Sequence, residues 1–251
     1  MPRIICSFSC GAASAVATKL ALAEFDEVEI VNIEVKEEHP DNRRFLADCE
    51  KWFGQKVTTI RDEKYNASTM ETFWKKKFII GPKQCPCSSE LKKRVINAWY
   101  RLDDEVVIGF TTEEQSRADR LIDANAERIF HFPLIERNLS KADCLGLLTK
   151  AGIELPEMYR LGFNNANCIG CVKGGQAYWL KIREIFPERF EEMAQMEEAI
   201  GTAILRYRSG PKKGQGMPLR EIQPTKRKVS DEPEISCSVH CELAEMQIED
   251  T

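Results

Sequence analysis

Short apolar runs alternate with amphipathic stretches along the first 130 residues of the chain. Runs rich in Val, Ile and Phe predict buried strands, and apolar residues at helical spacing predict the helices between them. We expect strands over 3–9, 28–35, 56–60, 105–110 and 128–132, and helices over 12–23, 41–53, 69–77, 89–102 and 113–125. This alternation predicts an α/β fold, a mostly parallel twisted sheet covered by helices on both faces.

The pattern becomes helical in the next part of the chain. Ser140 and Asp143 have the spacing of a capping box, which predicts a helix that ends at Gly152. Residues 155–175 then read as an ordered loop that carries two cysteines. Two further helices are expected, over 176–186 and 188–200.

The C-terminal part is basic. Between residues 206 and 228 there are eight Lys or Arg residues and one acidic residue, spread among prolines and other breakers. Such a composition predicts a mobile tail. We therefore expect a main domain over 1–187, an accessory helix over 188–204 and a mobile basic tail over 205–251.

Charge and hydropathy limit the binding partners and the cellular location that we expect. The chain has 251 residues and a formal net charge of −4, so any attraction to nucleic acid has to be local, through the basic residues 206–228. No stretch approaches the roughly 18–20 apolar residues of a membrane span, and residues 1–8 lack the basic flank of a secretory leader. We expect a cytoplasmic protein with no membrane partner. Its ten cysteines then indicate metal or redox ligands rather than disulfides.

The turn after the first strand is a candidate phosphate site. A strand that runs through small residues directly into a helix places backbone N–H groups and the positive end of the helix dipole around one concavity. Small residues let a phosphate approach the backbone closely. An ordinary tight turn rich in small residues is the alternative. The candidate nucleotide-binding residues are Ser9, Cys10, Gly11, Ala12, Ala13 and Ser14.

Four cysteines form two close pairs. Cys85 and Cys87 flank a proline, and Cys168 and Cys171 follow after 80 intervening residues. Both pairs stand in loops before expected helices. Four thiolates select zinc or an iron–sulfur cluster, and the spacing does not separate these two. Packing of the cysteines as small apolar residues is the remaining alternative.

The turn after the first strand resembles the pyrophosphate loop of the N-type ATP pyrophosphatase and PAPS reductase superfamily. The resemblance implies a Rossmann-like, HUP-type fold and an adenine-nucleotide substrate. Cys10 stands in place of the usual first glycine, and Ala13 in place of the usual aspartate. Without that carboxylate, the loop favours a substrate whose phosphates are held, such as an adenylyl sulfate, over one whose pyrophosphate is expelled.

The cysteine spacing is similar to that of assimilatory APS reductases, which hold a [4Fe-4S] cluster. Pro86 interrupts the first pair, so Cys85 could be a spectator beside a three-coordinate cluster, as in iron–sulfur tRNA thiolases. Zinc is the less favoured metal. The segments that contain Lys92 and Arg117 also resemble the family, which implies that both side chains neutralise the phosphosulfate.

The end of the chain completes the resemblance. In the reductases a C-terminal tail delivers a cysteine that attacks the sulfur of the substrate, and Cys237 with His240 is similar to that segment. The resemblance implies thiol-dependent reduction to sulfite, with Cys237 as the nucleophile and a thioredoxin-like reductant. Two other functions stay open. They are an iron–sulfur sulfur transferase that modifies a tRNA or DNA base, and a noncatalytic nucleotide-sensing iron–sulfur protein.

Overall fold

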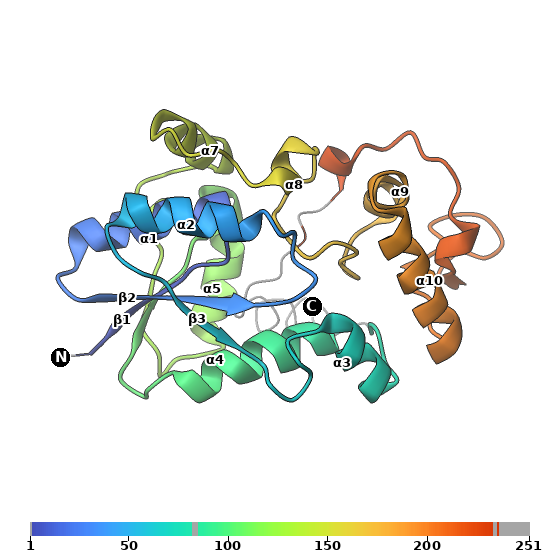
Figure 1. Cartoon of the computed structure of the whole chain (residues 1–251), viewed down its shortest axis with the longest axis horizontal. Helices are drawn as coiled ribbons and strands as arrows, with labels where there is room; N and C mark the ends of the chain where they lie inside the picture. Colours follow the sequence, from blue (N-terminus) through green and yellow to red (C-terminus); the bar gives the residue numbers. More distant parts are fainter. Residues whose placement is uncertain (1, 82–84, 233–234, 236–251) are drawn as a thin grey trace.

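A computed structural model describes residues 2–81, 85–232 and 235. Its centre is a five-stranded, all-parallel sheet in the order β3-β2-β1-β4-β5. The strands are β1 (Ile4–Ser7), β2 (Val28–Glu34), β3 (Thr58–Arg61), β4 (Glu105–Val107) and β5 (Phe130–His131). This arrangement, with helices around the sheet (Figure 1), confirms the predicted α/β class.

Helices cover both faces of the sheet. On one face lie α1 (Ala12–Glu24), α2 (Asn42–Phe53), α6 (Pro133–Glu136) and α7 (Lys141–Lys150), and on the other lie α4 (Arg94–Trp99) and α5 (Gln115–Asp123). Alternate residues of β1 point to opposite faces, as the pleat of a strand requires. Ile4 and Cys6 belong to the cluster under α1, while Ile5 packs with Ile96 of α4.

The strand order places a topological switch beside β1. From β1 the chain moves to β2 and β3 on one side, and then crosses to β4 and β5 on the other. Open α/β sheets bind ligands at such a switch point, outside the carboxyl ends of the two strands. The candidate phosphate loop 9–14 follows β1 and lies at this point.

Two segments differ from the expected secondary structure. The helix expected over 89–102 begins as a π-helical turn over Ser88–Lys93 and continues as α4. The loop expected over 155–175 contains a short helix, α8 (Glu157–Arg160). The remaining helices in the first half are α3 (Thr69–Lys76) and the 3-10 turn Thr112–Glu114 ahead of α5.

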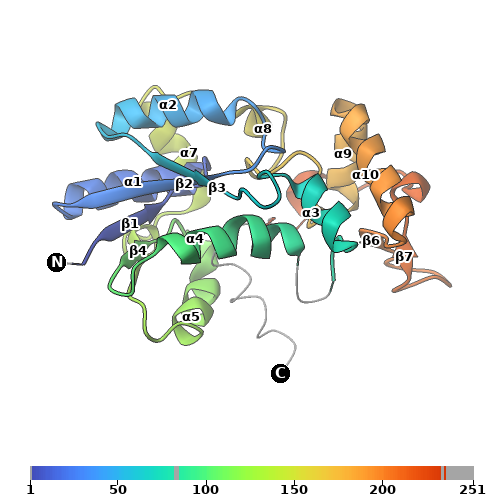
Figure 2. The same cartoon turned by 60° about the horizontal axis from the view of Figure 1, so that its bottom comes forward.

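The C-terminal third forms a second packed unit. The helices α9 (Gln176–Ile185) and α10 (Pro187–Ile200) stand together at one end of the sheet (Figure 2), and a two-stranded ribbon of β6 (Leu205–Arg206) and β7 (Gly216–Met217) follows. Because α9 and α10 share one buried cluster, the expected boundary at residue 187 falls inside this unit. Within the described part of the chain, no helix is long and apolar enough to cross a membrane.

Residues 205–232, expected to belong to a mobile tail, make buried contacts with the rest of the chain at several positions. Five apolar side chains of this stretch and its entry are buried against α9 and α10. The buried carboxylate of Glu197 also accepts hydrogen bonds from the amides of Ile204 (2.5 Å) and Leu219 (2.7 Å). The sequence pattern does not predict these contacts, because the buried apolar residues are irregularly spaced and belong to no helix or long strand. The five residues are Ile204, Leu205, Met217, Leu219 and Ile222.

A matched pair of leucines tests this docking. Leu219 is fully buried, whereas Leu102 is 96% exposed. Leu219→Ala should lower the free energy of unfolding by about 2–5 kcal/mol, since it leaves a cavity, and Leu102→Ala should change it by less than about 0.5 kcal/mol. Urea denaturation of both variants measures the difference. Equal, small effects would mean that this segment does not dock as described.

Candidate functional site

The loop after β1 is closed by its own serines. Ser14 Oγ accepts a hydrogen bond from the amide of Ser9 (3.2 Å) and donates one to the carbonyl of Gly11 (3.0 Å). Cys10 takes a left-handed conformation, with φ of 56°, and its side chain is buried. The loop therefore turns sharply into α1, whose first residues, Ala12 and Ala13, have the small side chains that an anion site at a helix end requires.

Gly109 presses against this loop from the end of β4. A Cβ at this position would lie 2.8 Å from both the backbone nitrogen and the Cα of Ser14. No side chain fits at that distance, so a glycine is needed where β4 passes the first turn of α1. The contact ties the two sides of the switch point together.

Tyr159 of α8 covers the loop from the other side. Its hydroxyl accepts a long hydrogen bond from the amide of Ala12 (3.4 Å), and a Cβ on Gly11 would lie 3.6 Å from the same oxygen. A phenol at this place can donate a hydrogen bond to a bound phosphate. The sequence does not indicate the contact between Tyr159 and Ala12, because the two residues are 147 positions apart.

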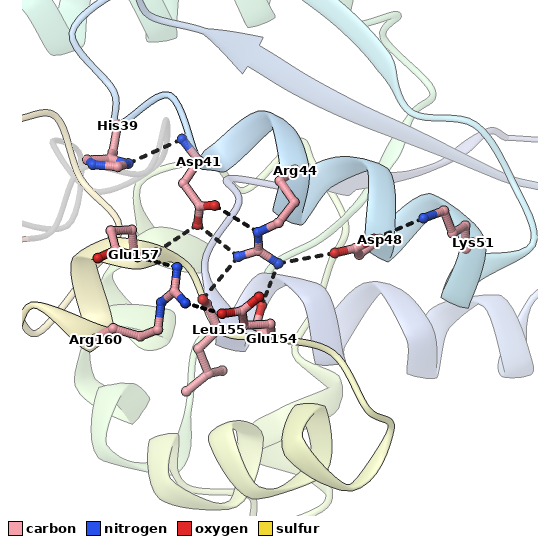
Figure 3. Close-up of polar contacts among 9 residues, drawn as sticks. All are labelled: His39, Asp41, Arg44, Asp48, Lys51, Glu154, Leu155, Glu157 and Arg160. Carbon is pink, nitrogen blue, oxygen red and sulfur yellow. Dashed lines mark hydrogen bonds and ion pairs between the residues drawn. The ribbon is translucent and has the colours of Figure 1, made fainter.

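An ion-pair network holds α8 in this position (Figure 3). Asp41 accepts two hydrogen bonds from Arg44 (2.7 and 2.8 Å) and one from the amide of Glu157 at the start of α8 (2.8 Å). Arg44 in turn donates to the carbonyls of Glu154 (2.9 Å) and Leu155 (3.1 Å). The hydrogen bonds from Arg44 lower the pKa of Asp41 to about 2. The network thus fastens the segment before Tyr159 to the start of α2.

The sign of this pKa shift gives a testable pH dependence. A carboxyl whose pKa falls from 3.8 to about 2 on folding adds stability above pH 3.8 and loses it as the pH falls towards 2. Asp41→Asn should lower the free energy of unfolding by about 1–2 kcal/mol at pH 7, and the deficit should shrink below pH 3.8. Chemical denaturation across this pH range measures it. A deficit independent of pH would contradict the assigned role of the carboxylate, and Asp48→Asn is the milder control.

Lys92 lies near the loop in a buried ion pair. Its ammonium is 3.3 Å from Glu38 Oε1, and Glu38 Oε2 accepts a hydrogen bond from Asn42 (3.2 Å). Burial raises the pKa of the Cys10 thiol, and the charge of Glu38 raises it further while Lys92 opposes the shift. The charge pair is therefore close to the loop. Glu38, which belongs to none of the sequence motifs, forms an ion pair with the ammonium of Lys92, the group expected to face the substrate.

Cys85 and Cys87 converge. Their Sγ atoms are 3.0 Å apart; Cys85 is buried and Cys87 half-buried. The Cys87 thiol lowers the pKa of Cys85 against the effect of burial, with a further contribution from the charge of Lys173. Proline between the two cysteines does not keep their side chains apart.

Cys168 and Cys171 stand on a turn that is pinned at several points. The hydroxyl of Tyr178 accepts a hydrogen bond from the amide of Cys171 (2.8 Å) and donates one to the carbonyl of Cys168 (2.9 Å). Between them, Ile169 donates its amide to the carbonyl of Glu37 (2.8 Å) and accepts from Arg189 Nε (3.1 Å). The backbone of this turn is therefore fixed by α9, by α10 and by the loop after β2.

The two pairs line the same two buried clusters. Cys85 and Cys171 belong to the same cluster under α9 and α10, and Cys87 packs against this cluster and against the smaller one that contains Cys168. Among the described residues, no group of three or more His, Cys, Asp or Glu side chains is already arranged as a metal site. The donor set of four soft thiols fits zinc or an iron–sulfur cluster, and ligation by all four remains a prediction.

The other buried thiols have a different character. Cys6, Cys49 and Cys144 are buried in the cluster under α1, and burial raises the pKa of each to about 12. They pack as small apolar side chains. The general expectation of metal or redox roles for the cysteines is therefore not supported for these three.

Arg117 and Cys237 complete the expected site residues. Arg117 lies in the first turn of α5, forms an ion pair with Glu114, and places its guanidinium over the ring of Phe110, 4.5 Å from the centroid. Its expected contact with a phosphosulfate remains a prediction. Cys237 and His240 lie outside the described residues, so their expected roles also remain predictions.

The comparisons with known proteins agree with this arrangement. A model of the phosphoadenosine phosphosulfate reductase domain matches residues 3–177. The chain belongs to this family. The matched region runs from β1 to the start of α9 and includes the loop 9–14 and both cysteine pairs.

Two other comparisons add little. No curated protein matches the chain. Among solved structures, it is similar to the U34-tRNA thiolase NcsA from Methanococcus maripaludis, described with its [4Fe-4S] cluster, at a TM-score of 0.40 and 11% identity. That alignment covers 80% of this chain and 72% of the thiolase. So distant a likeness carries no information about the substrate of this protein.

Proposed function

We propose that this chain is a thiol-dependent reductase of an adenylyl sulfate-type nucleotide, either plain or 3′-phosphorylated. The observation that carries the proposal is the position of the loop 9–14 at the switch point of a reductase-family sheet, with Tyr159 covering it and Lys92 near it. A helix end lined by small residues, next to a basic side chain, suits the phosphates of a nucleotide. Ala13 favours a substrate whose phosphates are held.

The proposed chemistry takes place at a cysteine. The thiolate of Cys237 attacks the sulfur of the phosphosulfate, an S–S bond forms, and the S–O bond to the phosphate breaks so that the nucleoside phosphate leaves with the electron pair. A thioredoxin-like dithiol then attacks the Cys237 sulfur and releases sulfite. Closure of a disulfide on that dithiol supplies the two electrons of the reduction.

Charged side chains and a metal centre support this reaction. In the proposal, Lys92 and Arg117 neutralise the negative charge of the phosphosulfate. Lys92 then contacts the substrate in addition to its ion-pair partner Glu38. The cysteines Cys85, Cys87, Cys168 and Cys171 hold a [4Fe-4S] cluster, with zinc as the alternative. Such a cluster would supply an electrostatic field near the sulfate.

The second candidate is a sulfur transferase acting on a nucleic-acid base, and the exposed cations of residues 206–228 favour it. This stretch contributes seven net positive charges to a chain of net charge −4. Arg208 and Lys213, in the loop between β6 and β7, are exposed and form no ion pair with the described residues. Such a surface suits the phosphates of an RNA such as tRNA. On this reading the loop 9–14 would still bind a nucleotide.

Replacement of the proposed nucleophile tests the reductase. Cys237→Ser should reduce sulfite release from adenylyl sulfate, with thioredoxin as the donor, by at least about 10³-fold, since the attacking thiolate is lost. Binding of the nucleotide, measured by calorimetry, should be unchanged. Cys241→Ser is the matched control and should keep full activity.

The possible results separate the candidates. A Cys237→Ser variant that releases sulfite at the wild-type rate would exclude the proposed nucleophile. Absence of sulfite from the wild type, together with gain of labelled sulfur by tRNA, would replace the reductase by the transferase. Nucleotide binding with neither reaction would leave a noncatalytic sensor.

A further inference from the structure

Three asparagine side chains hold the backbone of the C-terminal segment. Asn164 donates to the carbonyl of Val229 (2.9 Å), and Asn165 and Asn167 both donate to the carbonyl of Ile235 (3.2 and 2.8 Å). Lys141 donates to the amide oxygen of Asn165 (2.9 Å), which orients that amide towards Ile235. The docked segment, residues 229–232 with Ile235, is therefore fixed beside the turn that begins at Cys168.

Glu232 anchors the same segment to the start of α9. Its carboxylate accepts hydrogen bonds from the amides of Ala177 (2.7 Å) and Tyr178 (3.1 Å), in the first turn of that helix. The side chain is 8% exposed. A Cβ on Gly175 would lie 2.4 Å from Glu232 Oε1, so only a glycine leaves room for the carboxylate. The charge is satisfied by the free amides and by the helix dipole.

Tyr178 connects this anchor to the cysteine turn. Its backbone amide binds Glu232, while its hydroxyl bridges the carbonyl of Cys168 and the amide of Cys171. The residue is 3% exposed, and its ring packs against those of Phe163 and Trp179. A shift of α9's first turn must therefore move the phenol or break its two hydrogen bonds.

We infer that Glu232 and Tyr178 are positioning residues that couple docking of the C-terminal segment to the geometry of the Cys168–Cys171 turn. Segment docking stabilises the turn, and by reciprocity a group bound to the turn stabilises the docked segment. The second half of this statement rests on the proposed metal centre, whereas the first half does not. The sequence pattern does not predict this contact, because Glu232 and Tyr178 are 54 residues apart.

The metal-free full-length chain tests the first half. Glu232→Gln should speed alkylation of Cys168 and Cys171 by N-ethylmaleimide by about fivefold, the effect of losing about 1 kcal/mol from a charged hydrogen bond. Glu221→Gln, an exposed carboxylate in the same region, is the control. The alkylation rate of buried Cys49 reports unfolding of the whole chain. An unchanged rate at Cys168 and Cys171, or an equal rise at Cys49, would overturn the inference.

Tyr178→Phe removes the two hydrogen bonds to the turn and keeps the anchor. It should speed alkylation of Cys168 and Cys171 as Glu232→Gln does, while hydrogen exchange of the peptide 223–232 rises less than in Glu232→Gln, because the backbone amide still binds Glu232. Exchange in that peptide as fast as in Glu232→Gln would contradict this division of roles.

The metal-loaded chain tests the second half. Both variants should lose iron to a chelator about fivefold faster than the wild type. Equal rates of loss would overturn the coupling to the metal. If the wild type holds no metal, the proposed cluster fails, and the alkylation results still decide whether the link between segment and turn exists.

Discussion

Parallel strands end at the same edge of a sheet, and the whole candidate site depends on that constraint. Because β1 and β4 are neighbours whose chains depart in opposite directions, the loop 9–14 and Gly109 meet at the switch point. The loop after β2 leaves at the same edge and reaches the cysteine turn through the bond between Ile169 and the carbonyl of Glu37. Residues from four distant parts of the sequence are therefore linked at this edge of the sheet.

Side chains outside the sheet hold the surrounding loops and helices in place. The Asp41–Arg44 network fastens α8 to α2 and so brings Tyr159 over the phosphate loop. Tyr178 acts in a similar way on the cysteine turn, with Glu232 behind it. Each of these tyrosines joins a helix to a loop by its hydroxyl. The loop 9–14 and the cysteine turn are thus supported by separate contacts.

The sequence predicts the parts of the structure that depend on local pattern. Strand and helix periodicity locate the five strands and most helices, and the loop 9–14 and both cysteine pairs are visible as motifs. It does not predict contacts between distant residues, such as Tyr159 with Ala12 or Lys92 with Glu38. The docking of residues 205–232 was also missed, because it depends on scattered apolar side chains and on one buried acceptor, Glu197. Periodicity carries no signal for either kind of contact.

We propose that the two cysteine pairs, with 80 residues between them in the sequence, form one thiolate metal centre. Anaerobic analysis of iron, acid-labile sulfide and zinc tests it directly, in the wild type and in Cys87→Ser, Cys171→Ser and, as a buried-thiol control, Cys144→Ser. We predict iron and sulfide in the wild type and in the control, and loss of both from each of the other two variants. Metal that survives both replacements would contradict the shared site, and zinc without sulfide would contradict the cluster.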